Sequence, residues 1–218
     1  MYLPRPFEVK ELTEVKKFVA HVGSADLVTM DSTGTPLATL MPCQWIDDNT
    51  DYGQLMMHMS KGNSQWTEIK QNQIGLAIIH GVQAYVSPSS YVTKSENGKV
   101  VPTWNYTSVH LTGTVKVIED KAEILKIVSD LTNFHESHQS EPWEVADAPL
   151  DYLESQLNGI VGITLQISKV EAKAKLNQNR SAADRQGVIA TLSKSENFED
   201  LEVAKLMTTD EKPTNKLI

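Results

Sequence analysis

The sequence has a single cysteine, Cys43, and no apolar run that approaches the ~20 residues of a membrane-spanning helix. One cysteine cannot form a disulfide within the chain, and this is typical of proteins from a reducing compartment. The first residues, Met1 to Pro6, lack the apolar core of a secretory signal. We therefore expect a cytoplasmic protein that does not span the membrane.

Positive charge is also scarce. The chain has 20 Lys and Arg against 28 Asp and Glu, a net charge of -8. The average field repels phosphate backbones, so direct nucleic-acid binding is disfavoured. Lys169, Lys173 and Lys175 could form a local basic patch, although a solvated strand end is the simpler interpretation.

Catalytic signatures are missing as well. There is no Gly-x-Ser-x-Gly elbow and no Gly-x-Gly-x-x-Gly fingerprint, and Cys43 lies in an apolar run that favours an inert thiol. His135 and His138 are three residues apart but lack a third ligand nearby, so we predict no metal site. Whether the protein is an enzyme stays open.

What is present is a β-rich pattern in a chain of 218 residues with 40% hydrophobic residues. This is enough for one well-buried domain, or for one domain with a small appendage. Apolar residues at helical spacing predict a helix over 8–22, and Asp120 with Glu123 predicts the N-terminus of another. We expect an α+β fold, mainly β. The expected strands are 25–30, 35–45, 54–59, 75–86, 99–118 and 163–167. The expected organisation is a domain over 1–192, a helical insertion at about 119–158, and a tail or short docked helix over 193–218.

Residues 60–66 follow a predicted strand and open a helix expected to run towards Asn72. Backbone amides at a helix start, beside Lys61 and small polar side chains, form a natural anion cradle. This is the best phosphate candidate in the chain. An ordinary capped helix with an exposed lysine is the alternative.

A second candidate site follows Pro102, where Trp104, Asn105 and Tyr106 offer flat apolar faces beside amide and hydroxyl groups. Such a cluster suits a planar polar ligand, and a half-buried sheet edge is the alternative. A late run, residues 175–180, is dense in hydrogen-bond donors. Together these features favour a phosphorylated planar ligand that supplies the chemistry.

Several of these stretches resemble the PaiB-like FMN-binding negative transcriptional regulators. The resemblance covers about residues 1–192 and is carried, in order, by MYLPRPFEV, HMSKGNSQW, AYVSPSSY, VVPTWNY, GIVGITLQI and KLNQNRSAADRQGVIATL. The chain departs from the family pattern at Ser64, where the family has proline in Asn-Pro-Gln-Trp.

The resemblance implies an FMN-binding split β-barrel with peripheral helices, and a homodimer with FMN at the subunit interface. It implies phosphate contacts from Ser60, Lys61, Gly62 and Asn63. It further implies ring or ribityl contacts from Trp104 and Asn105, with Asn179 and Arg180 as candidates for contribution by the partner subunit.

Three functions are compatible with this resemblance. The first is an FMN-binding dimeric regulator whose effect on transcription is indirect. The second is a flavin-dependent oxidoreductase, since a flavin needs few protein groups beyond those that position it. The third is a haem-handling barrel with an axial ligand from His58, His80 or His110.

Overall fold

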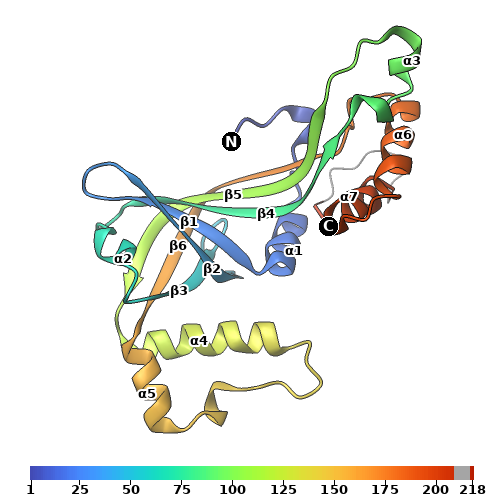
Figure 1. Cartoon of the computed structure of the whole chain (residues 1–218). Coiled ribbons are helices and arrows are strands. Elements are labelled where there is room, and N and C mark those ends of the chain that lie inside the picture. The colour runs from blue at the N-terminus through green and yellow to red at the C-terminus, as the bar shows by residue number, and fades with distance from the viewer. Residues whose placement is uncertain (209–216) are drawn as a thin grey trace. The chain divides into compact units, whose positions relative to one another are not determined.

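The computed structural model describes residues 1–208 and 217–218, and Figure 1 traces them. The chain divides into two compact units. Unit 1 comprises Met1–Phe18, His80–Val109 and Glu171–Ile218, and unit 2 comprises Val19–Ile79 and His110–Val170. Helix α1 (Leu12–Val22) and strands β4, β5 and β6 contribute residues to both units.

The strands form a closed barrel in the order β1-β2-β3-β6-β5-β4. Their bounds are β1 Ser24–Met30, β2 Pro36–Ile46, β3 Gln54–Ser60, β4 Ile74–Val86, β5 Thr103–Ile118 and β6 Ile160–Lys175. Alternation along β1 places Ala25, Leu27 and Thr29 inside, because successive side chains point to opposite faces of a sheet. Leu55 and Leu165, paired across β3 and β6, are fully buried.

The predicted helical insertion follows β5 in unit 2. It contains α4 (Lys121–Glu136), a short 3-10 turn at Val145–Asp147 and α5 (Leu150–Asn158). The Asp120 carboxylate accepts from the Ala122 and Glu123 amides at 3.0 Å each, which confirms the predicted N-cap. Helix α4 lies against β2 and β3 (Figure 1) and buries Ile124, Ile127 and Leu131 with Met56 of β3.

Unit 1 combines the N-terminal segment, the remaining parts of β4, β5 and β6, and several helices. These are the 3-10 turns Arg5–Phe7 and Pro88–Ser90, α3 (Thr93–Asn97), α6 (Ala182–Leu192) and α7 (Phe198–Thr208). Ser181 caps α6 by accepting from the Asp184 amide at 3.1 Å. Gly187 allows α6 to approach the chain at Ser90, because a Cβ there would lie 2.1 Å from the Ser90 carbonyl oxygen.

Two expected elements are wrong. The helix expected from the loop after β3 is only α2 (Gln65–Glu68), because Ile69 is extended and Asn72 is left-handed, with a φ of 61°. The strand expected from residue 99 begins at Thr103 instead. Helix α3, which ends at left-handed Gly98, occupies the preceding segment, and Pro102 cannot donate to a sheet.

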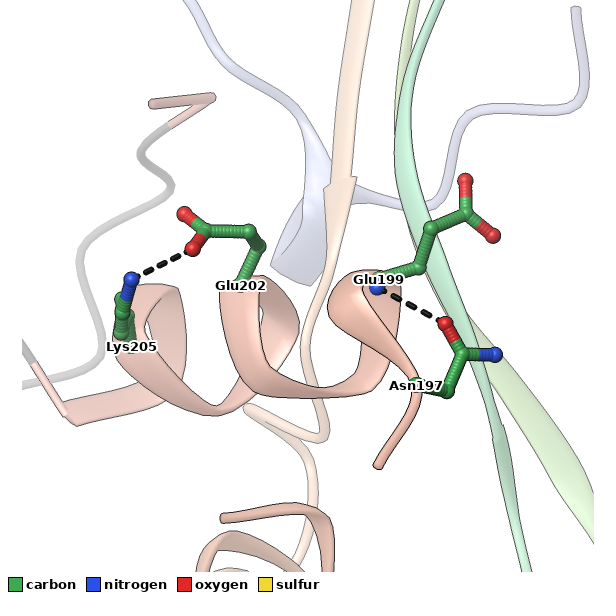
Figure 2. A network of polar contacts seen from close by, with 4 residues as sticks. All are labelled: Asn197, Glu199, Glu202 and Lys205. Carbon is green, nitrogen blue, oxygen red and sulfur yellow. Dashed lines mark hydrogen bonds and ion pairs between the residues drawn. The ribbon is translucent and has the colours of Figure 1, made fainter. Parts of the chain in front are cut away.

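The C-terminal segment includes α7, which buries Val203, Ala204 and Met207. Figure 2 shows its polar face. The Asn197 side chain accepts from the Glu199 amide at 2.9 Å, and Lys205 lies 2.5 Å from the Glu202 carboxylate. Residues 209–216 of the predicted tail lie outside the described residues, and the domain boundary at 192 stays a prediction.

Within residues 1–208 and 217–218, no helix has both the length and the apolar character that crossing a membrane requires.

The close approach of β5 and β6 at Gly113 provides a test of the barrel. A Cβ on Gly113 would lie 2.0 Å from the Gln166 carbonyl oxygen. We expect Gly113→Ala to lower the free energy of unfolding by about 3 kcal/mol, because rigid backbone must move. Gly159→Ala is the control, since its Cβ would find nothing closer than 3.4 Å. Equal denaturant midpoints for the two variants would contradict this packing.

Candidate functional site

The loop between β3 and α2 carries the predicted phosphate residues and belongs to unit 2. Its Lys61 amide donates to the Gly159 carbonyl at 2.8 Å, which ties the loop to the start of β6. The Asn63 side chain accepts from the Gln65 amide at 2.9 Å and donates to Thr39 of β2 at 2.8 Å. The loop is therefore anchored at both ends.

Gln65 is the main anchor of this loop, and the sequence analysis did not single it out. Its side chain is 3% exposed. Its amide nitrogen donates to the Leu27 carbonyl at 3.1 Å and to Thr29 at 3.0 Å, and its oxygen accepts from Thr39 at 2.5 Å. Because the Gln65 side chain is buried and its amide nitrogen and oxygen are both hydrogen-bonded, it links the loop rigidly to the β1–β2 hairpin.

The donors of this loop only partly fit a phosphate. The amides of Lys61, Gly62 and Asn63 already donate, to the Gly159 carbonyl, the Ser60 hydroxyl and the Ser60 carbonyl. A cradle of free backbone amides is therefore absent from this loop. The exposed Lys61 ammonium and the Ser60 and Ser64 hydroxyls are left to meet an anion. Their role in phosphate binding stays a prediction.

In unit 1, Trp104 presents a flat surface suited to a ring. The side chain is 51% exposed, and Tyr85 lies edge-on to it with ring centroids 6.0 Å apart. The Trp104 carbonyl accepts from the Lys175 ammonium at 2.5 Å, so β6 places a cation at the backbone of this residue. This arrangement fits a planar polar ligand.

Asn105 points to the other face of β5 and is fully buried. Its side-chain nitrogen donates to the Met207 sulfur at 3.3 Å, and its oxygen has no partner within the described residues. Direct contact between Asn105 and a flavin would require the packing against α7 to open. The predicted contact is thus harder to form at Asn105 than at Trp104.

The late donor run brings Arg180 onto the Tyr91 ring, with the guanidinium carbon 4.9 Å from the centroid. Asn177, left-handed with a φ of 60°, donates to the Tyr91 hydroxyl at 3.3 Å. Asn179 is exposed beside them. The predicted residues thus form two groups, 60–63 in unit 2 and Trp104, Asn105, Asn179 and Arg180 in unit 1.

Unit 2 also contains a cleft of about 930 Å³ that the sequence analysis missed. Its volume is within the range of small-molecule sites. Amides, hydroxyls and three lysines surround an apolar floor, and none of the predicted cofactor residues lines it. The lining residues are Gln54, Met56, 69–72, 114–118, Glu123, Lys126, Ile127, Thr164 and Gln166. These residues could not be grouped from sequence, since they meet only when β3, β5 and β6 pair beside α4.

The histidines form no metal centre in the described part of the chain, where no three His, Cys, Asp or Glu residues are placed to hold an ion. His135 and His138 line a pocket of about 230 Å³ with His21. His58 has a buried Nδ1 atom without a partner among the described residues, and burial lowers the pKa of its imidazole. A haem-ligand role for His58, His80 or His110 stays a prediction.

The barrel topology, with helices inserted after β5, defines an α+β split β-barrel. The chain is similar in fold to the flavocytochrome Anf3 from Azotobacter vinelandii, with a TM-score of 0.56 and 15% identity over 89% of this chain and 74% of that one. It is also similar to an FAD and heme binding protein from Mycobacterium smegmatis, with a TM-score of 0.56 and 14% identity over 77% and 73% of the two chains. The predicted fold class is confirmed.

Sequence comparison gives the family. A family model described as "Putative FMN-binding domain" matches residues 1–169. The protease synthase and sporulation protein PAI 2 of Bacillus subtilis (strain 168) is 34% identical over 209 residues, covering 95% of this chain and 96% of that protein. A Saccharomyces cerevisiae protein is 25% identical over 158 residues, 65% of this chain and 94% of its own length. The chain belongs to this FMN-binding family, as the resemblance implied, and FMN is its cofactor.

The reactivity of Cys43 provides a test of the buried barrel interior. Cys43 is fully buried, and burial raises the pKa of its thiol to about 12. Because the thiolate is the reactive form, we expect no alkylation by iodoacetamide at about pH 8 in the native protein and complete alkylation in denaturant. Mass spectrometry measures both. Stoichiometric modification of the native protein would contradict an inert Cys43.

Proposed function

We propose that the protein binds FMN as a homodimer and acts as a negative regulator through flavin binding, with an indirect effect on transcription. The observation that carries the proposal is the match of residues 1–169 to the FMN-binding family. The name of the Bacillus subtilis relative, a protease synthase and sporulation protein, is compatible with a regulatory role. The net charge of -8 favours an indirect effect over direct DNA binding, and we propose a cytoplasmic location.

The chain's own groups would bind and orient the cofactor. Lys61, with the Ser60 hydroxyl, would neutralise and hydrogen-bond the phosphate, and Arg180 would add charge from the partner subunit. The exposed Trp104 face would stack on the ring. Bound FMN supplies a redox-active isoalloxazine ring.

The outer face of the β2-β1-β4 sheet supports the dimer. Val28 pairs with Ala38 on one side and Leu76 on the other, so these side chains form one row across three strands. Leu40 is 66% exposed and Ile74 is 58% exposed. This exposed face is largely apolar, with Asp26 between Leu40 and Ile78. A large exposed apolar face marks an interface, and we assign this one to a second copy of the chain. The apolar members of this face are Val28, Met30, Pro36, Ala38, Leu40, Pro42, Ile74, Leu76 and Ile78.

A flavin-dependent oxidoreductase is the second candidate. The cleft of about 930 Å³ favours it, because a redox enzyme needs room for a second molecule beside its flavin and the predicted cofactor residues leave this cleft free. Anaerobic addition of NADH or NADPH separates the two functions. Bleaching of the flavin selects the oxidoreductase, and an unchanged spectrum favours the regulator.

Removing charge tests the predicted phosphate contacts. We expect Lys61→Ala combined with Arg180→Ala to weaken FMN binding about a hundredfold, because each lost charge-assisted contact costs about tenfold. Riboflavin, which has no phosphate, should bind both proteins equally. Fluorescence titration measures both ligands.

The matched control is Lys99→Ala combined with Lys121→Ala, which removes one exposed lysine from each unit. Its FMN affinity should equal that of the wild type. Unchanged FMN affinity in the Lys61→Ala, Arg180→Ala protein would remove these residues from the site.

The dimer is tested by charge on the apolar sheet face. We expect Leu40→Glu to give a monomer by light scattering at micromolar concentration, because a buried, unpaired carboxylate opposes association. Leu150→Glu is the control, since Leu150 is 79% exposed but lies on α5. A monomeric wild type, or a Leu40→Glu protein that remains a dimer, would refute this interface.

A further inference from the structure

Unit 1 gathers cationic side chains at the end of β6. The N-terminal segment pairs with this end, since the Val9 amide donates to the Ala172 carbonyl at 2.9 Å. Lys173 and Lys175 alternate with alanine along β6 and therefore share one face. Both ammonium groups lie over the Tyr106 ring, at 5.0 and 6.0 Å from its centroid.

Lys173 is buried in this cluster, with 7% of its surface exposed. The expectation of a solvated strand end is wrong for this residue, because β5 and the N-terminal segment cover it. Its ammonium donates to the Tyr106 hydroxyl at 2.6 Å and the Tyr2 carbonyl at 3.2 Å, and it lies 5.7 Å from the centre of the Tyr2 ring. All of these partners are neutral, although a buried charge is usually paired with an opposite one.

Lys175 and Arg180 enlarge the positive region. Burial lowers the pKa of Lys175, and the charges of Lys173 and Arg180 lower it further, so both cations repel the Lys175 ammonium. A hydrogen bond from the Thr93 amide lowers the pKa of Asp184, and the charge of Arg180 adds to this lowering, so the Asp184 carboxylate partly compensates Arg180. Its oxygens, however, accept from the Thr93 amide and hydroxyl at 3.0 and 2.8 Å.

Two carboxylates lie beside Lys173, since Glu8 is opposite it in a β-bridge and Glu171 shares its face of β6. Glu8 lies 3.8 Å from the Lys10 ammonium, and Glu171 lies 2.9 Å from the N-terminal amine. The same unit neutralises other lysines, as the Lys205–Glu202 pair in Figure 2 shows. In a chain with eight more acidic than basic groups, carboxylates are plentiful. Lys173 and Lys175 nevertheless donate to hydroxyl and carbonyl oxygens rather than to a carboxylate.

We propose that Lys173, Lys175 and Arg180 form a binding site for a phosphate monoester. Each ammonium has three N–H groups and uses two of them, Lys175 on the Thr103 hydroxyl and the Trp104 carbonyl. The remaining donors and the Arg180 fork match the several acceptor oxygens of a phosphate. The exposed Trp104 indole beside them suits an aromatic group attached to that phosphate.

The ligand has two sources with the same chemistry. One is the phosphate of FMN, held here in addition to or instead of the loop at Lys61. The other is a second phosphorylated small molecule that binds beside the flavin. At Arg180 the site rests on the proposed function, and it goes beyond that function at Lys173 and Lys175, which are not among the predicted cofactor residues. Inorganic phosphate alone can reveal it.

The test uses Lys175→Gln, which removes the less buried charge, with Lys205→Gln as the control. Calorimetric titration with inorganic phosphate is made on flavin-free and FMN-saturated protein, and FMN and riboflavin are titrated separately. We expect Lys175→Gln to weaken phosphate binding about tenfold and Lys205→Gln to leave it unchanged. Lys175→Arg keeps the charge and should restore binding, which separates the site from a folding defect.

The arms of the experiment distinguish the sources. Loss of phosphate binding in FMN-saturated protein, with weaker FMN but not riboflavin binding in Lys175→Gln, assigns the site to the flavin phosphate. Phosphate binding that persists in FMN-saturated protein assigns it to a second ligand. The proposal is overturned if the wild type binds no phosphate or if Lys175→Gln binds it as tightly as Lys205→Gln does. Failure to bind FMN would refute the proposed function and leave the phosphate result intact.

Discussion

Pairing between β3 and β6, from Gln54 opposite Gln166 to Ser60 opposite Ile160, is the constraint on which unit 2 depends. It joins the early hairpin to the late strand and so closes the barrel. Inside, it buries Leu55 against Leu165, and outside it provides the surface on which α4 packs. At its end, Ser60 leads into the loop whose Lys61 amide bonds to Gly159. Sheet closure thereby fixes where the predicted phosphate residues lie.

Local patterns predicted much of the fold. Apolar patterning predicted the six strands, and Asp120 with Glu123 predicted the start of α4, because each pattern depends on neighbours within one turn or strand. The expected helix after β3 was wrong at its C-terminal end, where Ile69 is extended, Asn72 is left-handed, and the Gln73 side chain donates to the Met30 carbonyl 43 residues away in sequence. Local helix propensity cannot predict hydrogen bonds between residues that are distant in the sequence. Helix α3 was missed because its polar composition also fits a loop.

The candidate site was predicted less completely for the same reason. Trp104 is exposed, as a ring-binding role requires, whereas Asn105 faces α7, and only the tertiary contact with Met207 reveals this. The sequence indicated Lys173 as part of a possible basic patch but not its burial, since Tyr2 and Tyr106 meet this lysine from distant segments. An acidic chain can therefore hold a concentrated positive site. The net charge of a protein affects its long-range attraction to nucleic acid, but it does not determine whether a local group of cations binds a single phosphate.

The central claim is that this split barrel holds FMN, and the visible spectrum of the protein tests it most directly. Purified protein is mixed with excess FMN, passed over a desalting column and scanned. The account predicts flavin retained in near-stoichiometric amount, with bands shifted from those of free FMN by the protein environment. Complete loss of the flavin on the column, at protein concentrations well above micromolar, would contradict the account.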